Sequence, residues 1–244
     1  MEIFKLFNLK NKVVIISGAG RGNGYQIAKD LSSIGIKVCR LDKKLIKINS
    51  KNVYDYKIDI TSSNKVKTVL NEIYKKFRKI DGLINNAGVS IESNKIDDIK
   101  KTLDINLISA LNLSYSICGF MKKRKEGSVI NITSLGAHQG FKNNPAYQIS
   151  KSGLSQLTRA IAKDFGEFGI RSNSICPGYI KTNMTIKSYR NPIKKKIYEN
   201  RTMLKRWGKP EDLTGACIYL LSPMSSYVTA SEIFVDGGWS KNSF

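Results

Sequence analysis

Short apolar runs alternate with amphipathic segments along the whole chain. The first run, Val13-Val14-Ile15-Ile16, is continuous and β-branched, which is typical of a parallel strand buried on both faces. Comparable runs follow at residues 36–42, 53–58, 82–85, 128–132, 171–175 and 233–235. Helical spacing fills the gaps, with long patterns at roughly 100–122 and 147–168. The alternation predicts an α/β protein with a doubly wound parallel sheet of about seven strands flanked by helices.

Nothing in the sequence interrupts this alternation. There is no Pro/Ser-rich linker, internal repeat or low-complexity tract. A chain of 244 residues can bury a large core, and one α/β domain of this length is ordinary. We therefore predict a single domain over residues 1–244.

A glycine-rich turn, Ser17-Gly18-Ala19-Gly20-Arg21-Gly22-Asn23-Gly24, separates the first strand from a helical pattern that starts at Tyr25. Glycines let the backbone approach a pyrophosphate, and a helix N-terminus offers unpaired N–H groups and the positive end of its dipole. The turn is therefore a candidate dinucleotide site in a single-domain Rossmann fold. A tight strand-to-helix turn without a ligand is the alternative.

The second strand ends on a carboxylate, Asp42, about 20 residues beyond the glycine turn. At that place a carboxylate accepts hydrogen bonds from ribose hydroxyls and repels a 2′-phosphate, so Asp42 favours NAD over NADP. Arg21 and Lys43 favour the opposite choice, because a basic side chain there can pair with a 2′-phosphate.

Tyr147 and Lys151 stand four residues apart in a helical pattern, and Ser134 follows the strand 128–132. Residues four apart share one face of a helix, so the ammonium of Lys151 would lie near the phenol of Tyr147. The pKa of an unperturbed Tyr is about 10, and a neighbouring cation favours the phenolate. The trio is a candidate proton-transfer site. A solvent-facing Tyr and Lys are the alternative.

At this point the chain resembles the short-chain dehydrogenase/reductase family across nearly its whole length. The family's glycine loop matches residues 17–24, although Ser17 replaces the usual Thr and Asn23 the usual aliphatic residue. Its active-site residues match Asn106, Ser134, Tyr147 and Lys151. The resemblance implies a cofactor site made by Ser17, Gly18, Arg21, Gly22, Asn23, Gly24, Asp42, Asp59, Ile60, Asn86, Ala87, Gly88, Tyr147, Lys151, Pro177, Gly178, Ile180 and Thr182.

The resemblance also implies roles. Tyr147 would exchange the proton of a secondary alcohol or ketone, Ser134 would donate to the same oxygen, and Lys151 would lower the pKa of Tyr147 and bond the nicotinamide ribose. Asn106 would hold a water that connects Lys151 to solvent. Asp59 would lie on the adenine side, with Ile180 and Thr182 at the nicotinamide. A homotetramer and a substrate lid at about residues 183–207 are further family expectations.

The C-terminal segment narrows the resemblance. Residues 206–212, 225–229 and 235–239 are similar to members that oxidise sugars, sugar acids and polyols, among them bacterial gluconate dehydrogenases. The 3-oxoacyl-[acyl-carrier-protein] reductases, which use NADPH, share much of this segment and are the second interpretation. A non-catalytic nucleotide sensor or nucleic-acid-binding protein is a third, which the presence of both Tyr147 and Lys151 disfavours.

The formal net charge is +22, but the charges are dispersed rather than clustered as in a nucleic-acid-binding surface. No nucleic-acid partner is predicted. One basic concentration lies in the expected lid, at Lys187, Arg190, Lys194, Lys195, Lys196, Arg201, Lys205 and Arg206. An anionic substrate and a solvated basic helix are the two hypotheses for it.

The remaining features predict a reduced, cytoplasmic protein without a membrane segment or metal. Residues 1–10 lack a signal-peptide core, and no apolar run approaches membrane-spanning length. The four cysteines are widely separated and show no metal-ligand spacing. His138, the single histidine, follows the active-site strand and is either a pocket residue or a solvated loop residue.

Overall fold

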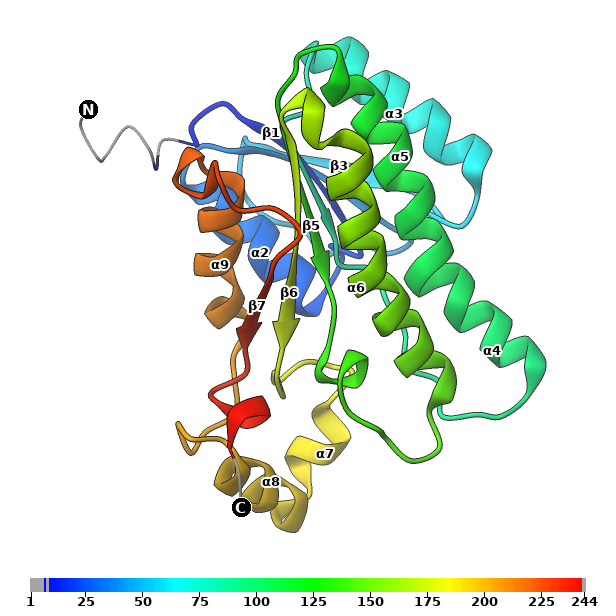
Figure 1. Ribbon diagram of the computed structural model, residues 1–244, viewed down its shortest axis with the longest axis vertical. Helices are drawn as coiled ribbons and strands as arrows, with labels where there is room; N and C mark the ends of the chain where they lie inside the picture. The colour runs from blue at the N-terminus through cyan, green and yellow to red at the C-terminus, as the bar shows by residue number, and fades with distance from the viewer. Residues whose placement is uncertain (1–6, 8, 243–244) are drawn as a thin grey trace.

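The computed structural model describes residues 7 and 9–242 and contains a seven-stranded sheet in which every neighbouring pair of strands is parallel (Figure 1). The strand order is β3-β2-β1-β4-β5-β6-β7. The strands are β1 (Val13–Ser17), β2 (Lys37–Asp42), β3 (Val53–Lys57), β4 (Gly82–Asn85), β5 (Gly127–Ile132), β6 (Ile170–Pro177) and β7 (Glu232–Val235). The chain therefore reverses its direction of winding between β1 and β4, which is where ligands bind in folds of this type.

Helices cover both faces of the sheet. They are α2 (Gly22–Ser33), α3 (Ser63–Phe77), α4 (Ile96–Leu103), α5 (Ser109–Lys122), α6 (Pro145–Phe165), α7 (Ile186–Arg190), α8 (Pro192–Arg201) and α9 (Thr214–Leu221). A π-helical turn, Asp104–Ile108, joins α4 to α5. Figure 1 shows α3 to α6 on one face and α2 with α9 on the other. The short helices α7 and α8 lie beyond the carboxyl ends of the strands.

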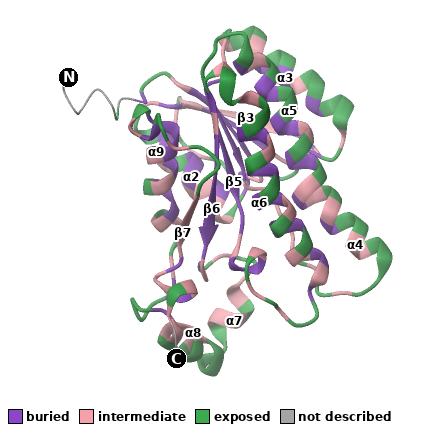
Figure 2. Cartoon of the chain, in the orientation of Figure 1, coloured by how far each residue is buried: buried purple, intermediate pink, exposed green. Residues whose placement is uncertain are grey.

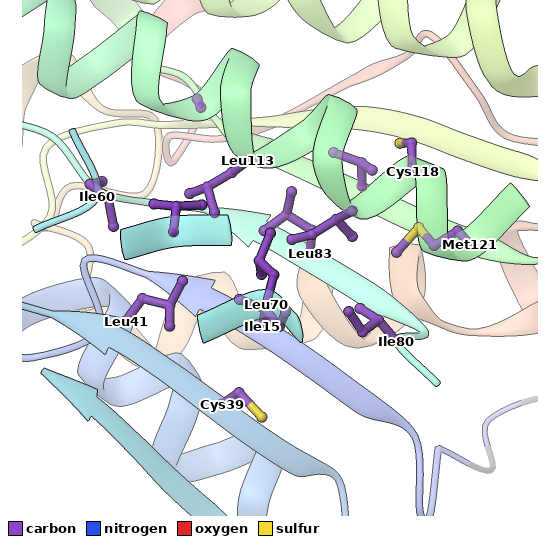
Figure 3. Packing of buried hydrophobic residues seen from close by; sticks show 14 of the residues in the cluster. Ile15, Cys39, Leu41, Ile60, Leu70, Ile80, Leu83, Leu113, Cys118 and Met121 are labelled. Atoms are coloured by element: carbon purple, nitrogen blue, oxygen red, sulfur yellow. The ribbon is translucent and has the colours of Figure 1, made fainter. Parts of the chain in front are cut away.

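Alternation of side chains along the strands creates two hydrophobic cores. Val13 and Ile15 of β1 pack into one core with residues from α3, α5 and α6, whereas Val14 and Ile16 pack into the other with residues from α2 and α9. Figure 3 shows the first core, where Leu70 and Leu113 meet the sheet. Figure 2 shows that the central strands are buried throughout. The rigid sheet fixes the positions of the loops at its carboxyl edge.

The fold predicted from the sequence is confirmed, and the predicted strands agree with the observed ones within about two residues. The pattern at 100–122 differs, because the observed helix begins at Ile96 and is interrupted by the π-helical turn. Among residues 7 and 9–242, no helix is both long and apolar enough to cross a membrane. The interpretation of residues 1–10 falls largely outside the described residues.

Candidate active site

The glycine loop between β1 and α2 is built against the loop that follows β4. Gly18 has a φ of 64°, and a Cβ at this position would lie 2.5 Å from the Cα of Ala87. Gly24 is equally constrained, since its Cβ would lie 2.4 Å from Nδ2 of Asn86. A side chain at either position would push the two loops apart. The predicted residues Gly18, Gly24, Asn86 and Ala87 are therefore brought together.

Hydrogen bonds complete this contact. The Asn86 amide donates to the carbonyls of Ser17 and Gly18 at 3.2 and 2.8 Å. The Ser17 hydroxyl accepts from the backbone N–H groups of Asn86 and Ala87 at 3.2 and 3.3 Å. Ser17 thus supplies the hydroxyl that its position requires, although it replaces the usual Thr.

Asp42 lies at the end of β2 with its carboxylate turned toward the glycine loop. Its Oδ2 accepts from the N–H of Gly20 at 2.9 Å and its Oδ1 from the N–H of Lys44 at 3.1 Å. Both bonds come from backbone, so the carboxylate is held by the fold and keeps further lone pairs for ribose hydroxyls. The predicted position of Asp42 beside the loop agrees with the structure.

Asp59 and Lys43 form an ion pair at 2.7 Å near this loop. The Asp59 carboxylate also accepts from the backbone and hydroxyl of Thr61 at 3.1 and 2.8 Å. The hydrogen bond from Lys43 is the main cause that lowers the pKa of Asp59 to about 2. Ile60, the next residue, is buried. Lys43 is therefore engaged with Asp59, whereas Arg21 is exposed at the start of α2.

The N-terminus of α2 fits a dinucleotide on two observations. The side chain of the N-cap residue Arg21 makes no capping hydrogen bond, so it satisfies none of the first N–H groups of α2. In addition, the buried Oδ1 of Asn23 lacks a hydrogen-bond partner among the described residues. Donors and an acceptor thus point to a polar ligand at the glycine loop. Gly22 lies close by, since its Cβ would be 3.7 Å from Cβ of Thr182.

The predicted proton-transfer residues converge where β5 ends. Ser134 has extended backbone and caps the short helical turn Leu135–Ala137, its Oγ accepting from the N–H of Gly136 at 3.1 Å. Pro145 starts α6, which carries Tyr147 and Lys151 on one face. The Lys151 ammonium is buried, donates to the carbonyl of Ile132 at 2.7 Å and lies 5.8 Å from the Tyr147 ring centre.

Burial dominates the titration of both side chains. It raises the pKa of Tyr147, and a hydrogen bond with Ser134 opposes the rise. Burial also lowers the pKa of Lys151 to about 8. Lys151 is not among the causes that shift the pKa of Tyr147, so the expectation that Lys151 lowers this pKa stays a prediction.

Asn106 lies in the π-helical turn between α4 and α5, where the widened turn brings its fully buried side chain toward α6. Its Nδ2 donates to the carbonyl of Val89 at 2.9 Å and to Oγ of Ser150 at 3.0 Å, and its Oδ1 accepts from the N–H of Val89 at 2.8 Å. Gly88 lies between two predicted partners, since its Cβ would be 3.5 Å from Oδ1 of Asn106 and 3.6 Å from Nζ of Lys151. The water expected at Asn106 stays a prediction.

The chain leaves β6 through Pro177 and Gly178 toward the expected nicotinamide side. The N–H of Gly178 donates to the carbonyl of Val235 at 3.0 Å, which ties this turn to β7. Ile180 is buried, and the hydroxyl of Thr185 contacts its carbonyl at 2.5 Å. The same hydroxyl accepts from the N–H of Thr182 at 3.0 Å. Thr182 thus lies at the start of the expected lid and beside the glycine loop.

A cavity of about 470 Å³ is lined in part by Phe141 and Tyr179, and none of Ser134, Tyr147 and Lys151 lines it. Its lining residues are Gln139, Gly140, Phe141, Tyr179, Ile197, Tyr198, Arg201 and Trp239. Phe141 and Tyr147 both flank Gly136, whose Cβ would lie 3.1 and 3.3 Å from their rings. The other cavity, of about 420 Å³, is lined by residues from 178–180, 202–212 and 234–238. We take the first as the candidate substrate cavity.

Sequence reasoning missed several residues that build this site. Arg40 is fully buried under the glycine loop, bonds both oxygens of Asp55 at 2.8 and 2.7 Å, and donates to the carbonyl of Ala19 at 3.2 Å. The aromatic lining of the cavity was also missed, although the aromatic residues of the lid segment were a usable signal. His138 lines neither cavity and instead pairs with Glu232 at 2.6 Å.

Comparisons with known proteins agree with this geometry. A family model described as enoyl-(acyl carrier protein) reductase matches residues 18–240. The chain is 33% identical over 251 residues to 2-dehydro-3-deoxy-D-gluconate 5-dehydrogenase of Bacillus subtilis, covering 96% of each chain. It is 34% identical over 244 residues to 3-oxoacyl-[acyl-carrier-protein] reductase of Buchnera aphidicola, covering 95% of this chain and 98% of the relative. A gluconate 5-dehydrogenase from Burkholderia cenocepacia, solved with NADP and tartrate, superposes with a TM-score of 0.91 at 25% identity over 99% of this chain and 100% of the other.

Proposed function

Because the chain belongs to the short-chain dehydrogenase/reductase family of NAD(P)-dependent oxidoreductases acting on CH–OH groups, we propose that its substrate is a sugar, sugar acid or polyol. The observation that carries the proposal is the convergence of Ser134, Tyr147 and Lys151, together with a cavity lined by aromatic side chains and the guanidinium of Arg201. Aromatic rings offer apolar faces to sugar C–H groups, and a guanidinium pairs with a carboxylate.

Each catalytic side chain has a task that its position supports. A bound nicotinamide cofactor supplies the hydride acceptor or donor. In reduction, the Tyr147 phenol protonates the developing alkoxide, and in oxidation its phenolate removes the hydroxyl proton. Ser134 donates a hydrogen bond to the same substrate oxygen. Lys151, fixed by the Ile132 carbonyl, favours the phenolate and orients the ribose, while Asn106 holds the loop at Val89 against α6.

We propose NAD as the preferred cofactor. The Asp42 carboxylate stands at the glycine loop, where it would repel a 2′-phosphate, and the ion pair with Asp59 engages the ammonium of Lys43. Exposed Arg21 is the cation that would favour NADP.

An anionic substrate is supported by the charges around the cavity. Arg201 lines it and lies 4.7 Å over the Trp239 ring, while Lys194 and Lys196 are exposed on the same helix, α8. Arg206, in the same basic segment, pairs with Asp212 at 2.7 Å. Replacing Lys194 and Lys196 with Gln should raise KM for a sugar acid in a salt-dependent way and leave KM for a neutral polyol unchanged.

We also propose a homotetramer. Ile108, Leu111 and Tyr115 form an apolar stripe on α5 and the turn before it, with exposed fractions of 44, 38 and 39%, and Ile149 of α6 is 57% exposed. Light scattering on the purified protein measures the mass directly, and a monomer would contradict the proposal.

The experiment that tests the main proposal is NADH or NADPH formation followed by absorbance with a panel of sugar acids, polyols and hydroxyacyl thioesters. Turnover with NAD on a sugar acid or polyol supports it. Turnover restricted to NADP and acyl thioesters would instead favour a 3-oxoacyl-[acyl-carrier-protein] reductase, the activity named for the relative at 34% identity.

A further inference from the structure

Three side chains with metal-binding atoms converge beside the loop that carries Ser134. His138 follows the turn Leu135–Ala137, Cys176 lies near the end of β6, and Glu232 is the first residue of β7. One ligand atom from each lies within 4.8 Å of the others. None of the three is among the proposed catalytic or cofactor-binding residues, so the cluster has no part in the function described above.

The Glu232 carboxylate is oriented by neighbouring hydroxyls. Thr133 donates to its Oε1 at 2.6 Å, and Ser174 donates to the same oxygen at 3.1 Å. The other oxygen, Oε2, lies 2.6 Å from Nε2 of His138. One oxygen is thus fixed from outside while the other faces the imidazole, which is how outer residues orient a ligating carboxylate in metal sites.

Cys176 and His138 differ in their access to solvent. Cys176 is fully buried, and burial together with Glu232 raises the pKa of its thiol. As a thiol it is a poor nucleophile, so oxidation or catalysis does not explain its position, but a bound metal can displace its proton. The His138 side chain is 35% exposed, so it is the most solvent-accessible of the three ligand side chains.

We propose that His138, Cys176 and Glu232 form a zinc(II) site in which water is the fourth ligand. Thiolate, imidazole and carboxylate are the ligands that zinc takes, and three protein ligands with one water make a common coordination set. Nε2 and Oε2 are 2.6 Å apart, whereas two such ligands of a tetrahedral zinc are separated by about 3.4 Å. Binding therefore requires the three ligand atoms, which lie within 4.8 Å of one another, to rearrange around the ion, and the His138 ring is 35% exposed.

Cys176 releases its thiol proton when the Zn–S bond forms. His138 binds through Nε2 as the neutral tautomer with its proton on Nδ1, so a doubly protonated imidazole releases a second proton. Glu232 binds as the carboxylate. Affinity for the metal therefore rises with pH, and binding acidifies a weakly buffered solution by one to two protons for each ion.

Zinc would bond the segment after Ser134 to β6 and β7, so it stabilises the fold around the active site without entering the hydride-transfer chemistry. The structural consequence is a higher unfolding temperature in the presence of the metal, since an ion that binds only the folded chain shifts the equilibrium toward it.

Cobalt(II) is the probe for the test, because it occupies zinc sites and its spectrum reports the ligands. The full-length protein is first treated with chelator and then titrated with Co²⁺. The expected result is one Co²⁺ for each chain, a thiolate-to-cobalt charge-transfer band in the near ultraviolet and visible bands of tetrahedral cobalt. Zn²⁺ should displace the cobalt stoichiometrically, since it binds such sites more tightly.

Variants of the three proposed ligands distinguish metal binding at this site from adventitious binding elsewhere on the protein. Cys176→Ala should abolish the charge-transfer band, and His138→Gln and Glu232→Gln should each weaken binding at least tenfold. Cys217→Ala, which removes an equally buried thiol from α9, is the matched control and should change nothing. A protein that shows no charge-transfer band, or binds Co²⁺ equally well after His138→Gln, would overturn the proposal and leave His138 and Glu232 as a simple hydrogen-bonded pair.

Discussion

The ion pair of Arg40 and Asp55 under the glycine loop predicts that losing the carboxylate destabilises the fold more than losing the guanidinium. The Arg40 side chain is 0% exposed, whereas that of Asp55 is 40% exposed. Asp55→Ala removes both partner oxygens and leaves the buried guanidinium with its hydrogen bond to the Ala19 carbonyl and the Tyr25 ring 5.9 Å away. Because removing one partner of a fully buried pair costs about 3–5 kcal/mol, and water reaches the Asp55 side of this one, we expect a loss of about 2–3 kcal/mol.

Arg40→Met acts differently. It removes the buried charge together with its desolvation cost, and Asp55 remains solvated, so the main loss is the donor to the Ala19 carbonyl, about 1 kcal/mol. Adding Arg40→Met to Asp55→Ala should therefore restore about 1 kcal/mol relative to the Asp55 variant.

Urea unfolding at one fixed protein concentration, followed by the fluorescence of Trp207 and Trp239, measures these free energies of unfolding. Titration with NAD, at urea concentrations where the protein is folded, shows whether the same substitutions also weaken cofactor binding at the glycine loop. A double variant less stable than Asp55→Ala alone would refute the reasoning, because the stranded charge would then not be the cause of the loss.

Three further predictions concern single positions. Ala230 has a φ of 55°, so Ala230→Gly should raise the free energy of unfolding by about 0.5–1 kcal/mol. Ala216→Gly, within α9, is the control and should lower the free energy of unfolding. Urea unfolding that shows no gain in stability for Ala230→Gly would contradict this prediction. Since burial lowers the pKa of Lys151 to about 8, its charge is present below that pH and lost above it. The kcat/KM for reduction should therefore fall above about pH 8. Lys151→Arg should move this fall to higher pH, because a guanidinium stays protonated there. If the fall stayed at the same pH in the variant, a group other than Lys151 would be its cause. Asp42→Ala should raise KM for NAD at least tenfold and lower KM for NADP, and equal KM values before and after would remove Asp42 as the selector.

Local patterns predicted much of the fold and of the candidate site. The buried strand at residues 13–16, the glycine loop and the Tyr147–Lys151 spacing all depend on neighbours in sequence, so they were visible without a structure. The carboxyl edge of a parallel sheet then brings such segments together.

Contacts between distant segments could not be predicted. Arg40 and Asp55 meet because β2 and β3 pair in one register, in which they lie opposite each other. His138 and Glu232 are 94 positions apart and become neighbours only when β7 joins the sheet beside β6. The burial of Tyr147, which raises its pKa, could not be predicted for a similar reason, because sequence spacing shows the nearby cation and not the depth of burial.

Replacing Tyr147 with Phe tests the central claim most directly, with turnover and cofactor binding measured on the same preparation. The variant removes only the hydroxyl that is proposed to transfer the proton, and Tyr179→Phe in the wall of the candidate cavity is the matched control. We expect turnover to fall by about three orders of magnitude, because an essential proton-transfer group is removed. The affinity for NAD should be unchanged, and the control should keep substantial activity. Full activity of Tyr147→Phe would contradict the account.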